Sequence, residues 1–186
     1  MKTEMEYIVA GCQKRQSTAQ KMLYEKFSPM MLGVCMRYTH SRDEAQDLLH
    51  DGFIKAFENI GKLKNASAVE SWLYKIMVNV SINYITRNRR IQYSDLDSME
   101  MQEKLEAVDD DSPLEDGGYT MDQIVCAIQE LPEQYRLVFN MREVEEMDYQ
   151  EIAEELGHPE STIRSNVSRA RQMLRKKLLN IKKATI

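Results

Sequence analysis

Glycine and proline are scarce in this sequence, with 7 Gly and 4 Pro among 186 residues. Long apolar runs are missing too: a membrane-spanning helix needs roughly 18 uninterrupted apolar residues, but even residues 72–85 contain Lys75, Asn79 and Asn83. The first residues carry charges inside their short apolar stretch, which argues against a secretory signal peptide. With 30% charged residues, the composition favours a helix-rich soluble protein. We expect the cytoplasm to be its compartment.

Cysteine is also rare, and its spacing argues against two kinds of site. Cys12, Cys35 and Cys126 are odd in number and form no C-x-x-C pair. Disulfide frameworks use even numbers of cysteines and zinc sites use closely spaced ligand pairs, so we expect neither. The sequence therefore predicts three reduced thiols, most of them buried.

Signatures of catalysis are missing as well. The sequence has no glycine-rich phosphate loop and no G-x-S-x-G motif. Its histidines, His40, His50 and His158, have no matching constellation of carboxylates or thiols. We therefore expect no enzymatic activity, no cofactor and no bound metal ion.

Charge is distributed unevenly along the chain. The net charge is −5, yet residues 1–92 carry 14 basic against 9 acidic groups, and residues 160–183 carry 8 against 1. Residues 93–119 carry the opposite balance, 1 basic against 10 acidic groups. Because affinity for phosphate depends on where basic groups cluster, the acidic total does not exclude a nucleic-acid partner.

The acidic segment 93–119 divides the chain. It holds an acid run at Asp109–Asp111 and a glycine pair, and its only helical tendency is a marginal helix near Met99–Val108. A connection of about 25 residues is too long for the interior of one compact domain. The sequence therefore predicts an all-α protein of two small helical domains, residues 1–92 and 120–186, joined by a flexible acidic linker.

Apolar residues recur with the 3.6-residue helical period outside this linker, and capping patterns mark several helix starts. Three pairs have the capping-box spacing: Ser41 with Glu44, Ser67 with Glu70, and Asp148 with Glu151. In a capping box the first side chain accepts a backbone N–H bond and the acid reaches back to the first residue's N–H. Helices are expected near residues 5–15, 17–39, 42–60, 68–89, 120–130, 133–145, 149–156 and 160–180.

Residues 149–167 have the spacing of a helix-turn-helix. Ala153 is small where two helices would cross, and Gly157 can adopt the positive φ that ends the first helix. His158 and Pro159 suit the turn that follows. This spacing predicts a second helix that begins near residue 160.

The second helix is expected to face the core with Ile163 and Val167. Its outward residues are then Ser161, Thr162, Arg164, Ser165, Ser168, Arg169 and Arg171, followed by Arg175, Lys176 and Lys177. A helix that enters the DNA major groove needs short polar and arginine side chains near its N-terminal half and basic groups along its flank. The alternative is an ordinary helical hairpin with a solvated basic face.

A polar stripe runs along the otherwise apolar helix at 68–89, and Arg89 extends it. The stripe consists of Lys75, Asn79, Asn83, Arg87 and Arg90. Asparagine offers a donor and an acceptor to a base edge, and arginines hold phosphates. Aromatic residues on the same helix, Trp72, Tyr74 and Tyr84, are able to stack on unpaired bases. The alternatives are a solvated face for the stripe and core burial for the aromatics, which we expect of Trp72.

The preceding helix carries acids at four-residue spacing: Asp43 or Glu44, Asp47 and Asp51. A divalent-metal site would need a companion acid or histidine on a facing helix. The stripe is therefore either a solvated face or a surface that docks against a basic partner helix. Its apolar neighbours Leu48, Leu49 and Phe53 would add to such a docking surface.

Three segments together resemble the extracytoplasmic-function sigma factors of bacterial RNA polymerase, which belong to the sigma-70 superfamily. Residues 43–57, DEAQDLLHDGFIKAF, resemble the polymerase-binding helix of that family. Residues 71–84, SWLYKIMVNVSINY, with the arginines that follow, resemble its promoter-melting helix. Residues 131–139, LPEQYRLVF, and the helix-turn-helix that ends in SRAR resemble its C-terminal domain. The resemblance covers nearly the whole chain except the linker.

The resemblance implies an alternative sigma factor that binds core RNA polymerase, reads the minus-thirty-five duplex and opens the minus-ten element. In the helix-turn-helix, the outward residues of the second helix would contact the minus-thirty-five duplex. The implied polymerase-binding residues are Asp47, Leu48, Asp51 and Phe53. The implied minus-ten contacts are Lys64 and Asn65, in a loop at 61–67, together with Trp72, Lys75, Asn79, Asn83, Arg87 and Arg90. The loop lacks the arginine, glycine and phenylalanine of many relatives, which leaves its preferred base open.

The resemblance also implies partners. These are core polymerase, promoter DNA as duplex and as melted non-template strand, and an anti-sigma factor that holds the chain inactive. We expect no membrane insertion and a monomer when the chain is free. The acidic linker either runs toward the RNA exit channel or serves as a solubilising tether. Two other functions stay open: a repressor or activator that binds duplex through residues 149–177 alone, and a module that sequesters another regulator.

Overall fold

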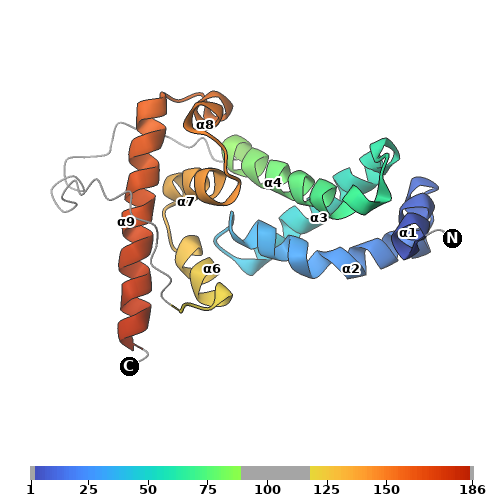
Figure 1. Ribbon diagram of the computed structural model, residues 1–186, viewed down its shortest axis with the longest axis horizontal. Helices are drawn as coiled ribbons and strands as arrows, with labels where there is room; N and C mark the ends of the chain where they lie inside the picture. The colour runs from blue at the N-terminus through green and yellow to red at the C-terminus, as the bar shows by residue number, and fades with distance from the viewer. Residues whose placement is uncertain (1–2, 89–117, 185–186) are drawn as a thin grey trace. The chain divides into compact units, whose positions relative to one another are not determined.

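The computed structural model describes residues 3–88 and 118–184, which form helices and the turns between them (Figure 1). The first range contains α1 (Glu4–Gln13), α2 (Ser17–Met36), α3 (Arg42–Asn59), the 3₁₀ turns η1 (Ile60–Lys62) and η2 (Ala66–Ala68), and α4 (Val69–Asn88). The second contains α6 (Met121–Gln129), α7 (Glu133–Phe139), the π-helical turn η3 (Asn140–Val144), α8 (Tyr149–Leu156) and α9 (Glu160–Ala184). Within these two ranges there is no strand, and no helix is long and apolar enough to cross a membrane.

The chain forms two compact units, Met1–Tyr84 and Ile85–Ile186. The predicted all-α, two-domain class is confirmed. Of the predicted linker, 93–119, only Gly118 and Tyr119 lie within the described residues, and the marginal helix expected at Met99–Val108 lies outside them. The domain boundaries at 92 and 120 stay predictions.

Helix α2 ends earlier than its apolar pattern suggests. It was expected to reach residue 39 and ends at Met36. Thr39 is buried at the turn, and its hydroxyl lies 3.2 Å from the carbonyl oxygens of both Cys35 and Ser41. A threonine that bonds nearby backbone in this way offers the chain an alternative to continued helix, which ends α2.

The single helix expected at 133–145 is instead α7 followed by the π-helical turn η3. Within this turn the N–H of Glu145 donates to the carbonyl of Asn140 at 3.0 Å. A π turn inserts one extra residue into a helix, and such turns are frequent at functional sites. Apolar periodicity does not distinguish this insertion from a continuous α-helix.

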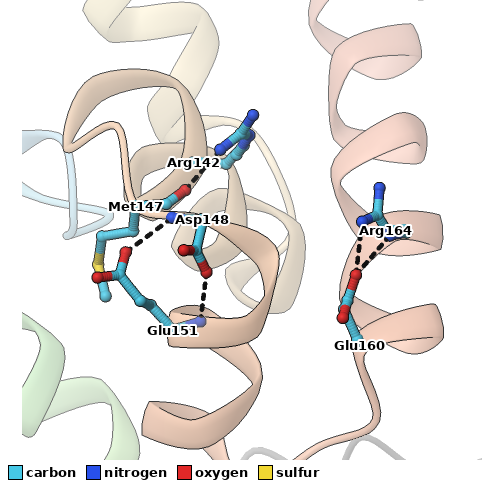
Figure 2. Close-up of polar contacts among 6 residues, drawn as sticks. All are labelled: Arg142, Met147, Asp148, Glu151, Glu160 and Arg164. Atoms are coloured by element: carbon cyan, nitrogen blue, oxygen red, sulfur yellow. Dashed lines mark hydrogen bonds and ion pairs between the residues drawn. The ribbon is translucent and has the colours of Figure 1, made fainter.

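Two of the three predicted capping patterns operate at helix starts. Asp148 accepts the N–H of Glu151 at 2.7 Å, and the Glu151 carboxylate accepts the N–H of Asp148 at 2.9 Å, so this capping box is complete (Figure 2). Ser41 accepts the N–H of Glu44 at 3.2 Å, but the Glu44 carboxylate accepts from His40 instead, at 3.0 Å. The box of Asp148 and Glu151 is confirmed. In the box of Ser41 and Glu44, only the bond from the Glu44 N–H to the Ser41 side chain forms.

The third predicted box, at Ser67 and Glu70, is wrong. Asn65 takes the cap position, and its side-chain oxygen accepts the N–H of Ser67 at 3.0 Å and the Ser67 hydroxyl at 2.9 Å. An asparagine that bonds backbone two residues on favours a tight turn. The 3₁₀ turn η2 therefore precedes α4, which begins at Val69.

The N-terminal unit has a core between helices. Helix α2 packs against both α1 and α3. The large side chains buried in this core are Ile8, Leu23, Met31, Leu48, Leu73 and Met77, which come from α1, α2, α3 and α4. Removing side chains of this size from water contributes about 1.5–3 kcal/mol each. This core fixes the outward faces of α3 and α4.

The C-terminal unit is built around α9, which packs against α6, α7 and α8 (Figure 1). One core cluster of this unit comprises Ala127, Ile128, Leu131, Tyr135, Phe139, Ala170, Leu174 and Leu178. All of the α9 members of this cluster lie on one helical face. The opposite face is therefore available to carry polar and basic side chains.

The cysteines are free thiols in two environments. Cys12 and Cys35 are buried, whereas Cys126 is exposed. Desolvation by burial raises the pKa of Cys12, and it raises the pKa of Cys35 to about 11. The prediction of mostly buried thiols is confirmed for two of them.

Candidate functional site

The predicted helix-turn-helix is formed by α8 and the first half of α9. Gly157 ends α8 with a φ of 68°, a left-handed conformation that residues with a side chain rarely adopt. His158 lies in the turn, as predicted. On the inner face, Ile152, Ile163 and Val167 are each 0% exposed. The turn and the core-facing residues predicted from the spacing are therefore confirmed.

The seven outward residues predicted on α9 all lie outside the core. Ser161, Arg164 and Ser165 are exposed, and the partly exposed members are Thr162, Ser168, Arg169 and Arg171. Asn166 is 3% exposed and was not predicted to be buried. Its position three residues after Ile163 is the usual spacing of a core-facing stripe, which was the available signal.

Arg164 makes contacts that the sequence pattern did not predict. Its Nε donates to the Glu160 carboxylate at 2.8 Å (Figure 2), and its Cζ lies 4.2 Å from the centroid of the Tyr149 ring. The Cζ of Arg142 lies 4.6 Å from the same centroid. Arg142 also donates from Nη1 to the carbonyl of Met147 at 2.8 Å. Three elements, η3, α8 and α9, therefore meet at Tyr149.

Other basic groups of α9 are paired with acids of the same unit. Arg171 donates to Glu143 at 2.8 Å, and Lys177 donates to Glu130 at 2.6 Å. These carboxylates offset part of the positive charge of α9. A DNA phosphate would have to compete with these carboxylates for the basic groups, which lowers the net electrostatic attraction between α9 and DNA.

The polar stripe of α4 is only partly within the described side chains. Lys75 and Asn79 are exposed, and Asn83 is partly exposed. The Asn83 amide donates to the carbonyl of Asn79 at 2.7 Å. The side chain of Arg87 and the whole of Arg90 lie outside the described residues. The described members therefore share one exposed surface.

The aromatic residues of α4 are placed between core and solvent. Trp72, Tyr74 and Tyr84 are all partly exposed, so Trp72 is mostly covered, as expected, but keeps part of its surface open to solvent. The Tyr74 hydroxyl accepts a bond of 3.0 Å from Arg37, which holds it toward α2. Tyr74 is therefore tied to the end of α2 through its hydroxyl.

Comparison with known proteins identifies this arrangement. Protein-family models described as Sigma-70 region 2 and Sigma-70, region 4 match residues 23–91 and 121–174. The chain is 33% identical over 181 residues to the RNA polymerase sigma-H factor of Pseudomonas aeruginosa, covering 92% of each chain. It is 31% identical over 178 residues to the ECF RNA polymerase sigma-E factor of Haemophilus influenzae, covering 92% of this chain and 93% of that one. The chain belongs to the extracytoplasmic-function sigma factors.

This sigma factor directs promoter-specific transcription initiation by RNA polymerase. A solved structure similar to it is the sigma factor RpoE in complex with the anti-sigma factor NepR from Bartonella quintana. That chain is 23% identical, with a TM-score of 0.47, and the match covers 85% of this chain and 95% of that one. The region 4 match contains the helix-turn-helix, and the region 2 match contains the whole of α3 and of α4.

Helix α1 lies outside both matched ranges, yet it supports a loop of the sigma factor. Lys64 and Asn65, the predicted minus-ten contacts of the 61–67 loop, are both exposed. The loop is held at its start by Gln13 of α1, whose amide donates to the carbonyl of Ile60 at 3.3 Å and of Leu63 at 3.1 Å. Sequence reasoning missed Gln13 because nothing local marks a contact across about 50 residues.

The predicted polymerase-binding face of the sigma factor needs a correction. Asp47 and Asp51 are exposed on α3, but Leu48 and Phe53 are each 2% exposed and belong to the core. The expectation of exposed apolar groups at these two positions is therefore wrong. The large apolar residue that α3 does expose is Ile54, at 56%. Residues 47, 51 and 54 follow the i, i+4, i+7 spacing of one helix face, which was the available signal.

The acids of α3 do not gather with other ligands into a metal centre. Across residues 3–88 and 118–184, no group of three or more His, Cys, Asp or Glu side chains is arranged to hold a metal ion. The two other roles expected of the acidic stripe are a solvated face and a docking surface.

Proposed function

We propose that three surfaces divide the work of this sigma factor. The outward face of α9 reads the minus-thirty-five duplex, and the exposed face of α4 with the 61–67 loop binds the melted minus-ten strand. The exposed face of α3 docks on the clamp helices of the largest polymerase subunit. Each assignment rests on the burial and contacts of the described residues, together with the roles that the family resemblance implies.

The observation that carries the proposal is the two-sided construction of α9. Ile163 and Val167 are fully buried, and the helix presents polar and basic residues on the other side. The proposed minus-thirty-five contacts are Ser161, Thr162, Arg164, Ser165, Ser168, Arg169 and Arg171. In the major groove, arginine pairs with guanine edges and short hydroxyl side chains reach phosphates or bases. A helix anchored by its own core side presents these groups in fixed register.

The proposed minus-ten surface combines a stacking group with amides. Trp72 is partly exposed, Lys75 and Asn79 are exposed on the same helix, and the loop supplies Lys64 and Asn65. An unpaired base gains stacking energy on an aromatic ring, and an amide meets its edge by hydrogen bonds. Asn83, Arg87 and Arg90 complete the proposed surface. Together these contacts offset the few kcal/mol needed to extrude a base.

The proposed docking face on α3 consists of Asp47, Asp51 and Ile54. An exposed isoleucine beside two carboxylates on one helix face suits a partner helix that carries basic groups near an apolar position. Leu48 and Phe53 instead hold α3 in the core. Their effect on polymerase binding is therefore indirect, through the orientation of the helix.

The remaining parts of the proposal concern the cellular setting. We place the chain in the cytoplasm, where bacterial polymerase and DNA reside, as a monomer when free. It acts as an initiation factor without catalytic residues, cofactor or metal of its own. An anti-sigma factor, which the family resemblance implies, would hold it inactive.

In vitro transcription with core polymerase tests the proposal. Core enzyme with the full chain is expected to initiate at defined promoters that core enzyme alone ignores. The free chain is expected to bind duplex promoter DNA weakly, because residues 120–159 carry 2 basic against 10 acidic groups. Any such binding should fall steeply with salt. Nanomolar, sequence-specific binding by the free chain without stimulation of core enzyme would favour a repressor instead.

A further inference from the structure

We propose that Tyr149 is a positioning residue that aims Arg164 at the upstream duplex and thereby sharpens base discrimination. The inference rests on the proposed function of α9. Tyr149 itself lies on α8, is partly exposed, and belongs to none of the surfaces assigned above. Its ring nevertheless contacts the guanidinium of Arg164, near the N-terminal end of α9.

Arg164 is held from two directions. Glu160, one turn earlier on α9, accepts its Nε at 2.8 Å. The ring of Tyr149 lies 4.2 Å from its Cζ. The first contact belongs to α9 itself, whereas the second reaches across to another helix. Only the second therefore ties the side chain's direction to the fold of the helix-turn-helix.

The Tyr149 ring is itself well anchored. Tyr149 is the first residue of α8 and lies within the complete capping box that Asp148 and Glu151 form (Figure 2). Arg142 donates to the Met147 carbonyl at 2.8 Å and so fixes the segment before the cap. The Cζ of Arg142 also lies 4.6 Å from the ring centroid. Because both the backbone and the ring of Tyr149 are held in place, the Arg164 guanidinium has a fixed surface to contact.

The two supports of Arg164 differ in what they do when DNA arrives. The Glu160 carboxylate occupies the N–H groups of the guanidinium and repels phosphate, so this contact competes with DNA. The Tyr149 ring is neutral and meets the guanidinium through its π face. Arg164 is then able to leave Glu160 for a base edge while it stays on the ring. The Arg164 side chain has then already lost part of the rotamer freedom that DNA binding would otherwise remove. This favours one geometry of its contact with the base over others.

The consequence differs for Glu160 and Tyr149. Glu160 lowers affinity for every duplex alike, because its charge opposes phosphates in any sequence. Tyr149 changes the preference among bases, because it fixes where the donor N–H groups point. The proposal therefore concerns base preference and not overall affinity.

The test measures base preference directly. Holoenzyme assembled with the full chain is offered duplex DNA with a randomised upstream segment and a pre-opened downstream bubble, and the bound molecules are sequenced. Tyr149→Phe keeps the ring and is expected to preserve the wild-type preference. Tyr149→Leu removes the cation–π contact and is expected to reduce the preference about two- to fivefold at the same base position that Arg164→Ala affects.

A double-mutant cycle separates positioning from a general structural role. Tyr149→Leu is expected to change nothing further at that position when combined with Arg164→Ala, because the residue it aims is gone. An equal loss in both backgrounds would show that Tyr149 merely stabilises the helix-turn-helix, and would overturn the proposal. Should Tyr149→Leu not fold, Tyr149→Gln, which a partly exposed first helical turn tolerates, takes its place in the cycle.

The same experiment distinguishes failure of the inference from failure of the proposed function. If Arg164→Ala alters the preference and Tyr149→Leu does not, α9 still reads the duplex and the positioning role is wrong. If Arg164→Ala alters the preference at no position, the assignment of Arg164 to the duplex fails, and the role of Tyr149 fails with it.

Discussion

Gly52 on α3 lies directly against the end of Met77 on α4. A β-carbon at position 52 would overlap the sulfur and terminal carbon of that side chain. Met77 is 0% exposed, so its end has little room to move aside. Through this close approach α3, which carries the proposed docking face, packs against α4, which carries the proposed minus-ten face. This contact therefore helps to fix the two surfaces relative to each other.

Gly52→Ala is expected to destabilise the N-terminal unit. Overpacking of a dense core costs typically about 1–3 kcal/mol, and this exceeds the helix propensity that alanine gains over glycine. Gly33→Ala on α2 is the matched control, because no heavy atom lies within 4 Å of a β-carbon there. It is expected to stabilise by up to about 1 kcal/mol. Urea unfolding of both variants measures this, and a stabilised Gly52→Ala would contradict the close packing.

Two neighbouring residues of α3 should separate polymerase binding from folding. Ile54→Ser removes an exposed side chain and is expected to weaken binding to core polymerase with little change in thermal stability. Phe53→Ala removes a buried ring and is expected to cost about 3–5 kcal/mol of folding free energy. Pull-down with core enzyme and a thermal melt of the free chain measure both. Normal polymerase binding by Ile54→Ser combined with Asp47→Ala and Asp51→Ala would refute the docking face.

The two DNA-reading surfaces should respond differently to the state of the template. Holoenzyme with Asn79→Ala and Asn83→Ala is expected to fail at strand opening on a closed duplex promoter. Holoenzyme with Arg164→Ala and Arg169→Ala should lose duplex affinity, by about 1–3 kcal/mol for each good base contact. It should recover much activity on a template whose downstream bubble is already open. Permanganate footprinting of unpaired thymines measures opening on both templates, and normal opening by the asparagine variant would remove α4 from the melting role.

Gln13→Glu should disturb the 61–67 loop from a distance. The substitution keeps the size of the side chain but replaces its donor N–H₂ group with an oxygen that faces the carbonyls of Ile60 and Leu63. Loss of these two part-buried hydrogen bonds is expected to destabilise the ordered conformation of the loop by about 1–3 kcal/mol. Binding to a single-stranded minus-ten oligonucleotide in holoenzyme should weaken while core binding stays unchanged. Gln20→Glu on α2 is the matched control, and equal behaviour of the two variants would exclude the supporting role of Gln13.

The three cysteines should differ in reactivity. At neutral pH a thiol reagent is expected to modify Cys126 quickly in the folded chain, because Cys126 is exposed. Cys12 and Cys35 should react only after denaturation, since burial shields them and raises the pKa of each thiol. Mass spectrometry of the labelled chain measures the order. Rapid labelling of Cys35 in the folded chain would contradict its burial.

The raised pKa of Cys35 also predicts a dependence of stability on pH. The pKa moves from 9.0 to about 11 on folding, so the folded chain retains this proton more firmly than the unfolded chain does. The stabilisation is complete below pH 9.0 and declines as pH rises toward about 11. The difference in unfolding free energy between the wild type and Cys35→Ala should therefore shrink across this window. A difference that stays constant with pH would contradict the shift.

Local patterns were sufficient to predict the helix-turn-helix. Asp148 and Glu151 form their capping box within four residues, and Gly157 ends α8 because a left-handed φ is easiest for glycine. Ile163 and Val167 face the core because the helical period places them on one side. Each of these features depends on residues close together in the chain, so the order of the residue types carries the information. The all-α class followed for the same reason.

Contacts between distant segments were decided only by the tertiary structure. An apolar side chain on α3 is compatible with core or surface, and the packing of α2 and α4 around that helix buried Phe53 and left Ile54 outside. The ring of Tyr149 contacts Arg164 because α8 packs against α9. Gln13 reaches the loop because α1 folds back to the end of α3. The energy of each such contact depends on atoms that the chain brings together over long sequence separations. The sequence by itself therefore determined which helices form and which kind of DNA-binding motif they make, whereas tertiary packing decided which of their side chains reach a partner.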